Sequence, residues 1–388
     1  MKNLNKTLLA TSVAVGSVLG TSSAFSLEQF FNVPGTRAMA MSGAFVATAG
    51  DSTAMWYNPA GLAKLGNSID FTLEQGDIVE EKTAAEFVPG GDLYDTDSDI
   101  KYLAVAGGGM GLAYFKPYRF FNTATYNVSG STATAEIETE LSELKYGYGA
   151  NLTENLRWGG TIDLISKEAD INDLNGSAND DDISQLDFGF SLGLQGDVAL
   201  DDMVAKGHKF SYGIMYRSGT DSEVEDDITL GKVKGVPGRP EAMNYGFGYS
   251  APLPVVLNVP MFITFNYEID NLVYEDILNA VGAANAQSDL EETKNAWGIE
   301  LQLFPGFLQN GSLFVRFGGA EIEIDGVDDQ RATFVDDIEV ASFGVGIKYG
   351  KWVFDYAKET RDLKVNPTFV NLRDQELDLS AISVSYAF

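Results

Sequence analysis

The sequence predicts an all-β protein, a 14-stranded antiparallel transmembrane β-barrel with an N-terminal plug (hatch) in its lumen. Three observations predict this fold. The chain begins like an exported protein, most of it alternates between apolar and polar or small residues, and the links between alternating segments are long and short in turn. Strands with one apolar face, joined by tight turns at one rim and long loops at the other, are typical of outer-membrane barrels.

Residues 1–24 have the order of a secretory signal peptide. Lys2 and Lys6 precede an apolar run from Leu8 to Leu19, and small residues follow as far as Ala24. That run is too short to cross a hydrocarbon core of ~30 Å as a helix, whereas it suits the apolar core of a signal peptide. We therefore expect export, with cleavage close to Ala24.

Residues 25–66 do not follow either regular period. The segment is rich in small and apolar residues, and Asn58-Pro59 followed by Gly61 indicates turns. Irregular backbone at membrane depth is tolerated only where it is buried in protein or lines a water-filled space. We therefore predict that residues 25–66 form a plug inside the barrel.

Residues 67–388 are predicted to form the barrel. In the stretch from Leu186 to Leu194, every even residue is apolar and every odd residue is small or polar, which is the period of a β-strand. Fourteen segments share this pattern: 68–75, 99–107, 110–121, 136–150, 155–168, 184–197, 208–218, 241–250, 259–269, 293–304, 311–321, 339–349, 351–361 and 376–388.

The links after odd-numbered segments are long, and most of those after even-numbered segments are short. Five of the long links carry 29 of the 56 acidic residues, so the formal charge of −30 belongs mainly to one rim. Solvated loops account for this charge, and bridging to anionic lipopolysaccharide through divalent cations is the alternative. Nucleic acid is excluded as a partner, because phosphate binding requires surplus Lys and Arg.

The last segment ends in an aromatic residue. Tyr386 and Phe388 lie on its apolar face, with small residues on the other. A terminal aromatic that closes an alternating strand resembles the signal read by the outer-membrane barrel assembly machinery. We expect assembly as a monomer in the outer membrane of a Gram-negative bacterium.

The N-terminal region resembles the FadL family of outer-membrane transporters for long-chain fatty acids and other hydrophobic compounds. The resemblance rests on residues 25–62, and the wider superfamily, which includes PorV-type proteins, shares Asn-Pro-Ala-Gly-Leu at 58–62. It implies a plug motif, an N-terminus that reaches the ligand, and uptake of hydrophobic small molecules. The matching plug residues are Gly35, Arg37, Gly43, Asn58, Pro59 and Ala60.

An enzyme is not expected. The chain has no cysteine and a single histidine, His208, so thiol chemistry and clustered histidine metal sites are excluded. No serine has a recognisable nucleophile setting. We predict no catalytic residues, no metal and no cofactor.

Candidate ligand-binding residues are apolar side chains of the mature N-terminus and of the face opposite the aromatic-rich one. They are Phe25, Leu27, Phe30, Phe31, Met215, Phe262 and Phe314. The alternative function is that of a PorV-like outer-membrane partner that docks secreted proteins for a secretion system.

A lateral opening is predicted in the third strand. Pro117 removes one donor from the strand ladder, and Gly109 and Gly111 let the preceding backbone bend. The family that the sequence resembles has a kink in its third strand that opens the wall sideways. The alternative is a proline tolerated near a strand end with no opening.

Overall fold

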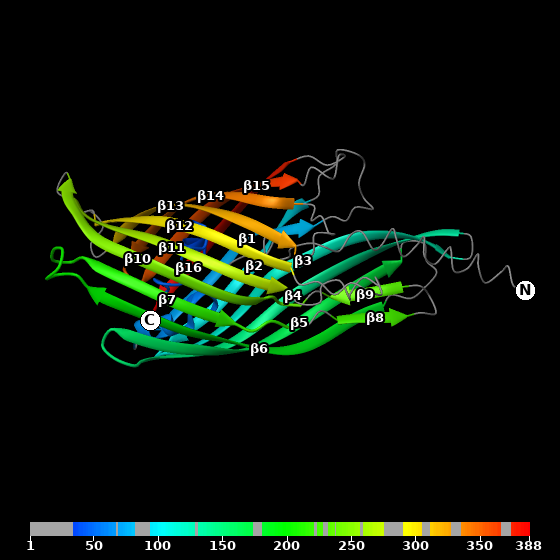
Figure 1. Cartoon of the computed structure of the whole chain (residues 1–388), viewed down its shortest axis with the longest axis horizontal. Helices are drawn as coiled ribbons and strands as arrows, with labels where there is room; N and C mark the ends of the chain where they lie inside the picture. Colours follow the sequence, from blue (N-terminus) through cyan, green and yellow to red (C-terminus); the bar gives the residue numbers. More distant parts are fainter. Residues whose placement is uncertain are drawn as a thin grey trace, which may run out of the picture.

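The computed structural model describes residues 34–66, 69–81, 94–128, 131–173, 181–220, 223–227, 232–236, 238–256, 259–274, 290–304, 311–326, 335–365 and 374–388. Fourteen antiparallel strands form a closed barrel, and Figure 1 shows them running along its long axis. Each strand pairs with its neighbours in chain order, and β1 closes the barrel on β16 from Asp70–Ala387 to Gly76–Ala381.

The barrel strands are longer than the average globular strand of ~5–6 residues. They are β1 Ile69–Glu81, β2 Tyr94–Gly107, β3 Met110–Val128, β4 Ser131–Asn151, β5 Leu156–Asp173, β6 Asp181–Ala199, β7 Lys209–Arg217, β10 Glu241–Val256, β11 Val259–Tyr274, β12 Leu290–Leu303, β13 Ser312–Gly326, β14 Val335–Tyr349, β15 Trp352–Val365 and β16 Gln375–Ala387. All fourteen predicted strands are present.

The predicted strand ends are wrong at the rim of the long links. β3 continues to Val128 and β4 begins at Ser131, so the link expected at 122–135 is mostly strand. β8 Glu223–Asp227 and β9 Lys232–Val236 form a separate hairpin inside a predicted loop. These pieces carry Thr, Glu and Lys with no continuous apolar face, so hydropathy alternation does not reveal them.

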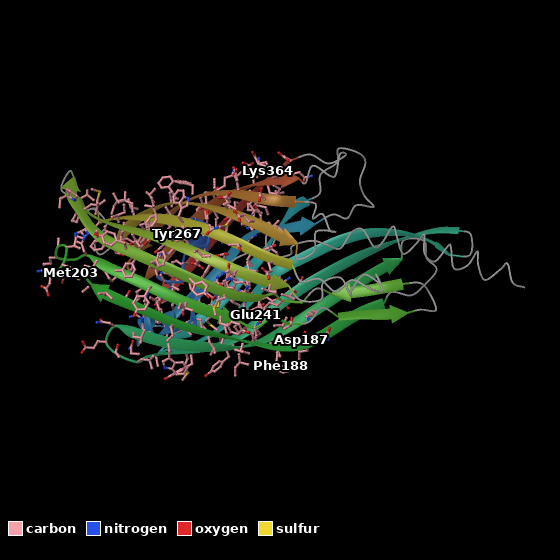
Figure 2. All side chains as sticks on the ribbon, viewed as in Figure 1. Asp187, Phe188, Met203, Glu241, Tyr267 and Lys364 are labelled. Atoms are coloured by element: carbon pink, nitrogen blue, oxygen red, sulfur yellow. The ribbon has the colours of Figure 1, made fainter. Side chains whose placement is uncertain are left out.

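The two faces of the wall differ as predicted. In β6 the even residues from Leu186 to Leu194 point outward and are 44–73% exposed, whereas Ser191 and Gln195 are buried inside. Figure 2 shows Phe188 projecting from the outer surface and Met203 at the end where the short turns lie. An apolar outer face is what a lipid environment requires, so the barrel has the architecture of an outer-membrane protein.

Residues 34–66, termed the inner segment, lie within the barrel toward the end with the short turns (Figure 1). The segment contains α2 Thr36–Met39, α3 Ala54–Tyr57 and the 3-10 helix η2 Pro59–Leu65. None of the helices in the described ranges has the length and apolar character needed to cross a membrane. Most of the inner segment is buried, with Met41, Ala54, Met55 and Leu62 fully enclosed.

The barrel seam closes with aromatic contacts at the C-terminus. The Phe388 backbone N–H donates to the Ile69 carbonyl at 2.8 Å, and the Tyr386 ring packs edge-on against Trp352 and Phe388. The Phe388 side chain is nevertheless 66% exposed. Its ring therefore contributes little burial to the finished barrel.

We predict that Phe388→Ala lowers the folded fraction during assembly while the assembled barrel keeps its stability. The substitution removes the exposed ring and retains the backbone bond to Ile69. Heat-modifiability on a gel measures the folded fraction. Phe188→Ala, which removes a ring of 73% exposure far from the terminus, is the matched control. Equal folded fractions for the two variants would refute a terminal assembly signal.

Candidate functional site

The inner segment is seated on glycines of the barrel wall. A Cβ at Gly159 of β5 or at Gly193 of β6 would lie within 3 Å of Pro59 or Asn58. Such a distance is shorter than real Cβ contacts, so these two positions admit only glycine unless the inner segment shifts. The backbone of the inner segment therefore approaches the wall backbone directly.

Asn58 joins the inner segment to the wall. Its side-chain amide donates to the Val46 carbonyl at 3.0 Å and to the Leu194 carbonyl of β6 at 2.9 Å, while its side-chain oxygen accepts from the Ala60 N–H at 3.2 Å. Asn58 thereby caps η2, and Pro59 occupies the first helical position, where it loses no hydrogen bond. The predicted motif Asn58-Pro59-Ala60 is thus a single structural unit.

Three glutamates of the wall hold the N-terminal half of the inner segment. Glu74 accepts from the Thr36 N–H at 2.5 Å, and Glu268 accepts from the N–H groups of Phe45 and Val46 at 2.5 and 2.7 Å. Glu300 binds Arg37 through two bonds of 2.8 Å. Charge-assisted bonds of this kind are stronger than neutral ones, so they fix the segment in one position.

The remaining predicted plug residues lie where the backbone turns. Gly35 and Gly43 have φ of 94° and 82°, a region that favours glycine, and they flank the turn of α2 that carries Arg37. Arg37 also lies 3.6 Å from Asp51. Burial by itself lowers the pKa of Arg37, but Glu300 and Asp51 outweigh it and raise that pKa above its usual value. Arg37 is therefore always charged.

A cavity of about 50 Å³ lies between the inner segment and the strand ends nearest the long links. It is termed the chamber and is lined in part by Trp56, Tyr57, Met215 and Leu272. Its charged lining comprises four carboxyl groups and three cationic side chains: Glu268, Asp270, Glu292, Glu359, Arg217, Lys294 and Arg361. Arg217 lies over the Trp56 ring, 4.2 Å from the ring centroid.

The wall changes its pairing along β3. The β2–β3 ladder has six pairs and stops at Tyr102–Phe115, and β3 next pairs with β1, at Arg119–Glu80 and Phe120–Glu81. The β3–β4 ladder has a bulge between Phe115 and Tyr118. Pro117 lies within this bulge. We term residues 116–118, with the facing part of β2, the wall break.

Side chains make contacts across and beside the wall break. On the lumen side, Phe115 packs edge-on against Trp56 of the inner segment, with ring centroids 4.6 Å apart. The Lys116 ammonium lies 3.1 Å from Asp99 of β2 and 3.1 Å from Glu140 of β4. None of these five residues is predicted from the sequence as a site residue, because only the fold brings Trp56 and Asp99 next to β3.

The other residues predicted to bind ligand or to open the wall lie in different parts of the structure. Met215 lines the chamber, whereas Phe262 and Phe314 lie near the short-turn rim, in register with Gln302 on either side. Gly109 lies in the turn between β2 and β3, and Gly111 makes room for Met55, so neither lies at the wall break with Pro117. Phe25, Leu27, Phe30 and Phe31 lie outside the described residues.

Within the described ranges, no group of three or more His, Asp or Glu side chains is placed to hold a metal ion. His208 lies at the short-turn rim, where its Nδ1 is 2.5 Å from the Tyr249 hydroxyl. The chamber instead offers aromatic and aliphatic surface next to hydrogen-bonding groups. Such a lining is suited to a solute with a large apolar part and a small polar part.

No protein-family model matches this chain, and no curated protein matches it. Two solved structures have a similar fold. One is a FadL homologue from Pseudomonas aeruginosa, with 11% identity and a TM-score of 0.54 over 92% of this chain and 99% of that one. The other is the toluene transporter TodX from P. putida, with 12% identity and a TM-score of 0.51 over 93% of this chain and 99% of that one.

At identities this low, the fold comparison establishes the barrel architecture but does not identify a ligand. The chain has the barrel fold of these two outer-membrane proteins.

We predict that Asn58→Asp loosens the inner segment. The substitution keeps the side-chain shape but replaces the donor facing Val46 and Leu194 with a carboxylate oxygen. Leaving buried carbonyls without a donor should cost about 1–3 kcal/mol. Limited proteolysis of the folded barrel measures the effect. Asn155→Asp, in an exposed turn, is the matched control, and equal cleavage rates for both variants would contradict this role of Asn58.

Proposed function

We propose that this protein is an outer-membrane channel for the uptake of long-chain fatty acids or other hydrophobic small molecules. The observation that carries the proposal is the wall break, which Trp56 connects to a chamber lined partly by apolar side chains. Residues 34–66 act as the plug, because they are bonded to the wall by Asn58 and three glutamates. The plug therefore blocks the lumen to a solute that enters from the long-loop rim.

The exit that we propose is sideways, into the membrane. Trp56 lines the chamber and also contacts Phe115, so one aromatic surface joins the chamber to the wall break. Transfer of an alkyl chain into lipid gains ~0.8 kcal/mol per CH₂, whereas passage into the periplasm gains nothing comparable. Pro117 supports this route, because it lacks the donor that a continuous ladder would use.

Lys116 connects the strands at the wall break. Its ammonium bonds to strands on both sides, β2 through Asp99 and β4 through Glu140. Where the backbone ladder stops, these side-chain bonds hold the strands together. Ion pairs that solvent still reaches contribute only ~0–1 kcal/mol, so this closure opens at small cost.

The proposal is tested by uptake in cells that lack their own hydrophobic-compound channels. We expect the protein to raise uptake of labelled fatty acid or labelled alkylbenzene above that of cells with an empty vector. A labelled small sugar should not enter faster, because the plug fills the lumen. Sugar uptake without uptake of either hydrophobic compound would indicate a diffusion porin and overturn the proposal.

We predict that locking the wall break stops uptake reversibly. The chain has no cysteine, so Asp99→Cys with Lys116→Cys gives one defined pair that a reducible bifunctional thiol reagent joins. Uptake should fall toward the level of the empty vector and recover on reduction.

The matched control is Lys358→Cys with Asp378→Cys. It replaces an outer-face ion pair of 2.8 Å across β15 and β16, whose ladder is continuous. Cross-linking this pair should leave uptake unchanged. If the Asp99–Lys116 lock also left uptake unchanged at equal protein level, the lateral exit would be abandoned.

A further inference from the structure

Two uncharged polar atoms in the chamber lack hydrogen-bond partners among the described residues. They are the Tyr57 hydroxyl and the Asn244 side-chain oxygen, and both residues line the cavity. Tyr57 is 4% exposed and Asn244 is 9% exposed. A buried polar group left without a hydrogen-bond partner is unfavourable, so each atom gains if a ligand supplies its partner.

The orientation of the Asn244 amide is fixed by its neighbours. Its NH₂ group donates to Asp270 at 2.5 Å and to Glu268 at 3.4 Å. The side-chain oxygen therefore cannot exchange places with the nitrogen without facing two carboxyl groups. Asn244 thus presents an acceptor to the chamber.

Tyr57 presents a donor. Burial, reinforced by Glu268, raises the pKa of the Tyr57 hydroxyl well above its ordinary value of 10.0, so the group keeps its proton. Its ring is held edge-on to Phe45, with centroids 5.4 Å apart. The chamber therefore offers one donor and one acceptor, both neutral.

We infer that the chamber binds the hydroxyl end of an uncharged hydrophobic compound, an alcohol or a phenol. A hydroxyl group accepts from Tyr57 and donates to Asn244 at once. This inference rests on the proposed uptake function and names the class of compound within it.

The charged lining disfavours a fatty-acid carboxylate. Arg361 already bonds to Glu359 at 2.7 Å, and Lys294 lies 3.6 Å from Asp270. A ligand carboxylate would therefore approach a site whose four carboxyl groups outnumber its three cationic side chains, and it would have no proton to give to Asn244. A pure hydrocarbon would leave both Asn244 and Tyr57 unsatisfied.

The size of the chamber fits one end of a solute. A cavity needs ~10–15 Å³ on this measure to hold one water and ~150 Å³ to hold benzene, so about 50 Å³ takes a hydroxyl group and the atoms next to it. The atoms next to the hydroxyl group would contact Trp56, Met215 and Leu272. Met215, predicted from the sequence to contact ligand, thus lies beside the polar subsite.

The test compares three probes of one shape: 4-ethylphenol, 4-ethylbenzoate and ethylbenzene. Binding to the full-length protein in lipid nanodiscs is measured by NMR saturation transfer, with empty nanodiscs subtracted. One hydrogen bond of ordinary strength predicts that wild type binds 4-ethylphenol about 3- to 10-fold more tightly than ethylbenzene. 4-Ethylbenzoate should bind more weakly than 4-ethylphenol.

The variant is Tyr57→Phe, which removes one oxygen and no hydrogen bond of the described structure. It should abolish the preference for 4-ethylphenol and leave ethylbenzene binding unchanged. Tyr356→Phe, on the outer face, is the matched control and should keep the preference. Asn244→Ala provides a second variant with the same expected loss.

The outcomes separate this inference from the proposed function. Equal binding of 4-ethylphenol and ethylbenzene, in wild type and in Tyr57→Phe, would mean that the chamber holds water only. The hydroxyl subsite would then be wrong, while hydrophobic uptake would stand. Tightest binding of 4-ethylbenzoate would overturn the subsite in favour of a carboxylate site. No binding of any probe would overturn both proposals.

Discussion

The requirement that backbone polar groups be paired inside the membrane governs this structure. Lipid offers no hydrogen bonds, so the strands must close on themselves, as β1 does on β16. Closure fixes which side chains meet lipid and which face the lumen. In a closed barrel, a strand pair with an interrupted backbone ladder therefore differs clearly from the other pairs. The β2–β3 ladder has six residue pairs whereas the β3–β4 ladder has seventeen, so backbone pairing in the wall is sparsest where β3 diverges from β2.

Charged side chains inside the barrel bind the irregular backbone of the inner segment. The short turns of the inner segment are bonded internally, and wall carboxylates such as Glu268 accept from N–H groups between those turns. Elsewhere in the lumen, buried charges satisfy one another. Arg239, from the chain between β9 and β10, bonds to Asp163 at 2.7 Å, and Lys145 lies 2.9 Å from the same residue. Paired groups of this kind hold an element in place without exposing a lone buried charge.

The sequence predicts an element of the fold where the membrane imposes a regular pattern of apolar and polar residues on it. Lipid imposes alternation on residues such as Leu186 to Leu194, so the sequence predicts all fourteen strands. Beyond the membrane that constraint ends, and the extensions of β3 and β4 and the β8–β9 hairpin escape detection. The site depends on contacts between distant residues. Pro117 and Met215 were identified by type and position, but the pairing of Trp56 with Phe115 follows only from where the inner segment sits.

Trp56 relates the chamber to the wall break. One of its neighbours is Arg217, whose guanidinium lies over the ring, and another is Phe115, which packs edge-on against it. The first contact is polar and faces the chamber, while the second is apolar and faces the wall break. A solute with one hydroxyl group has the same two-sided character. On the proposed lateral route, its polar end would lie in the chamber and its apolar part toward Phe115, so the end of the molecule that lipid accepts most readily would reach the membrane first.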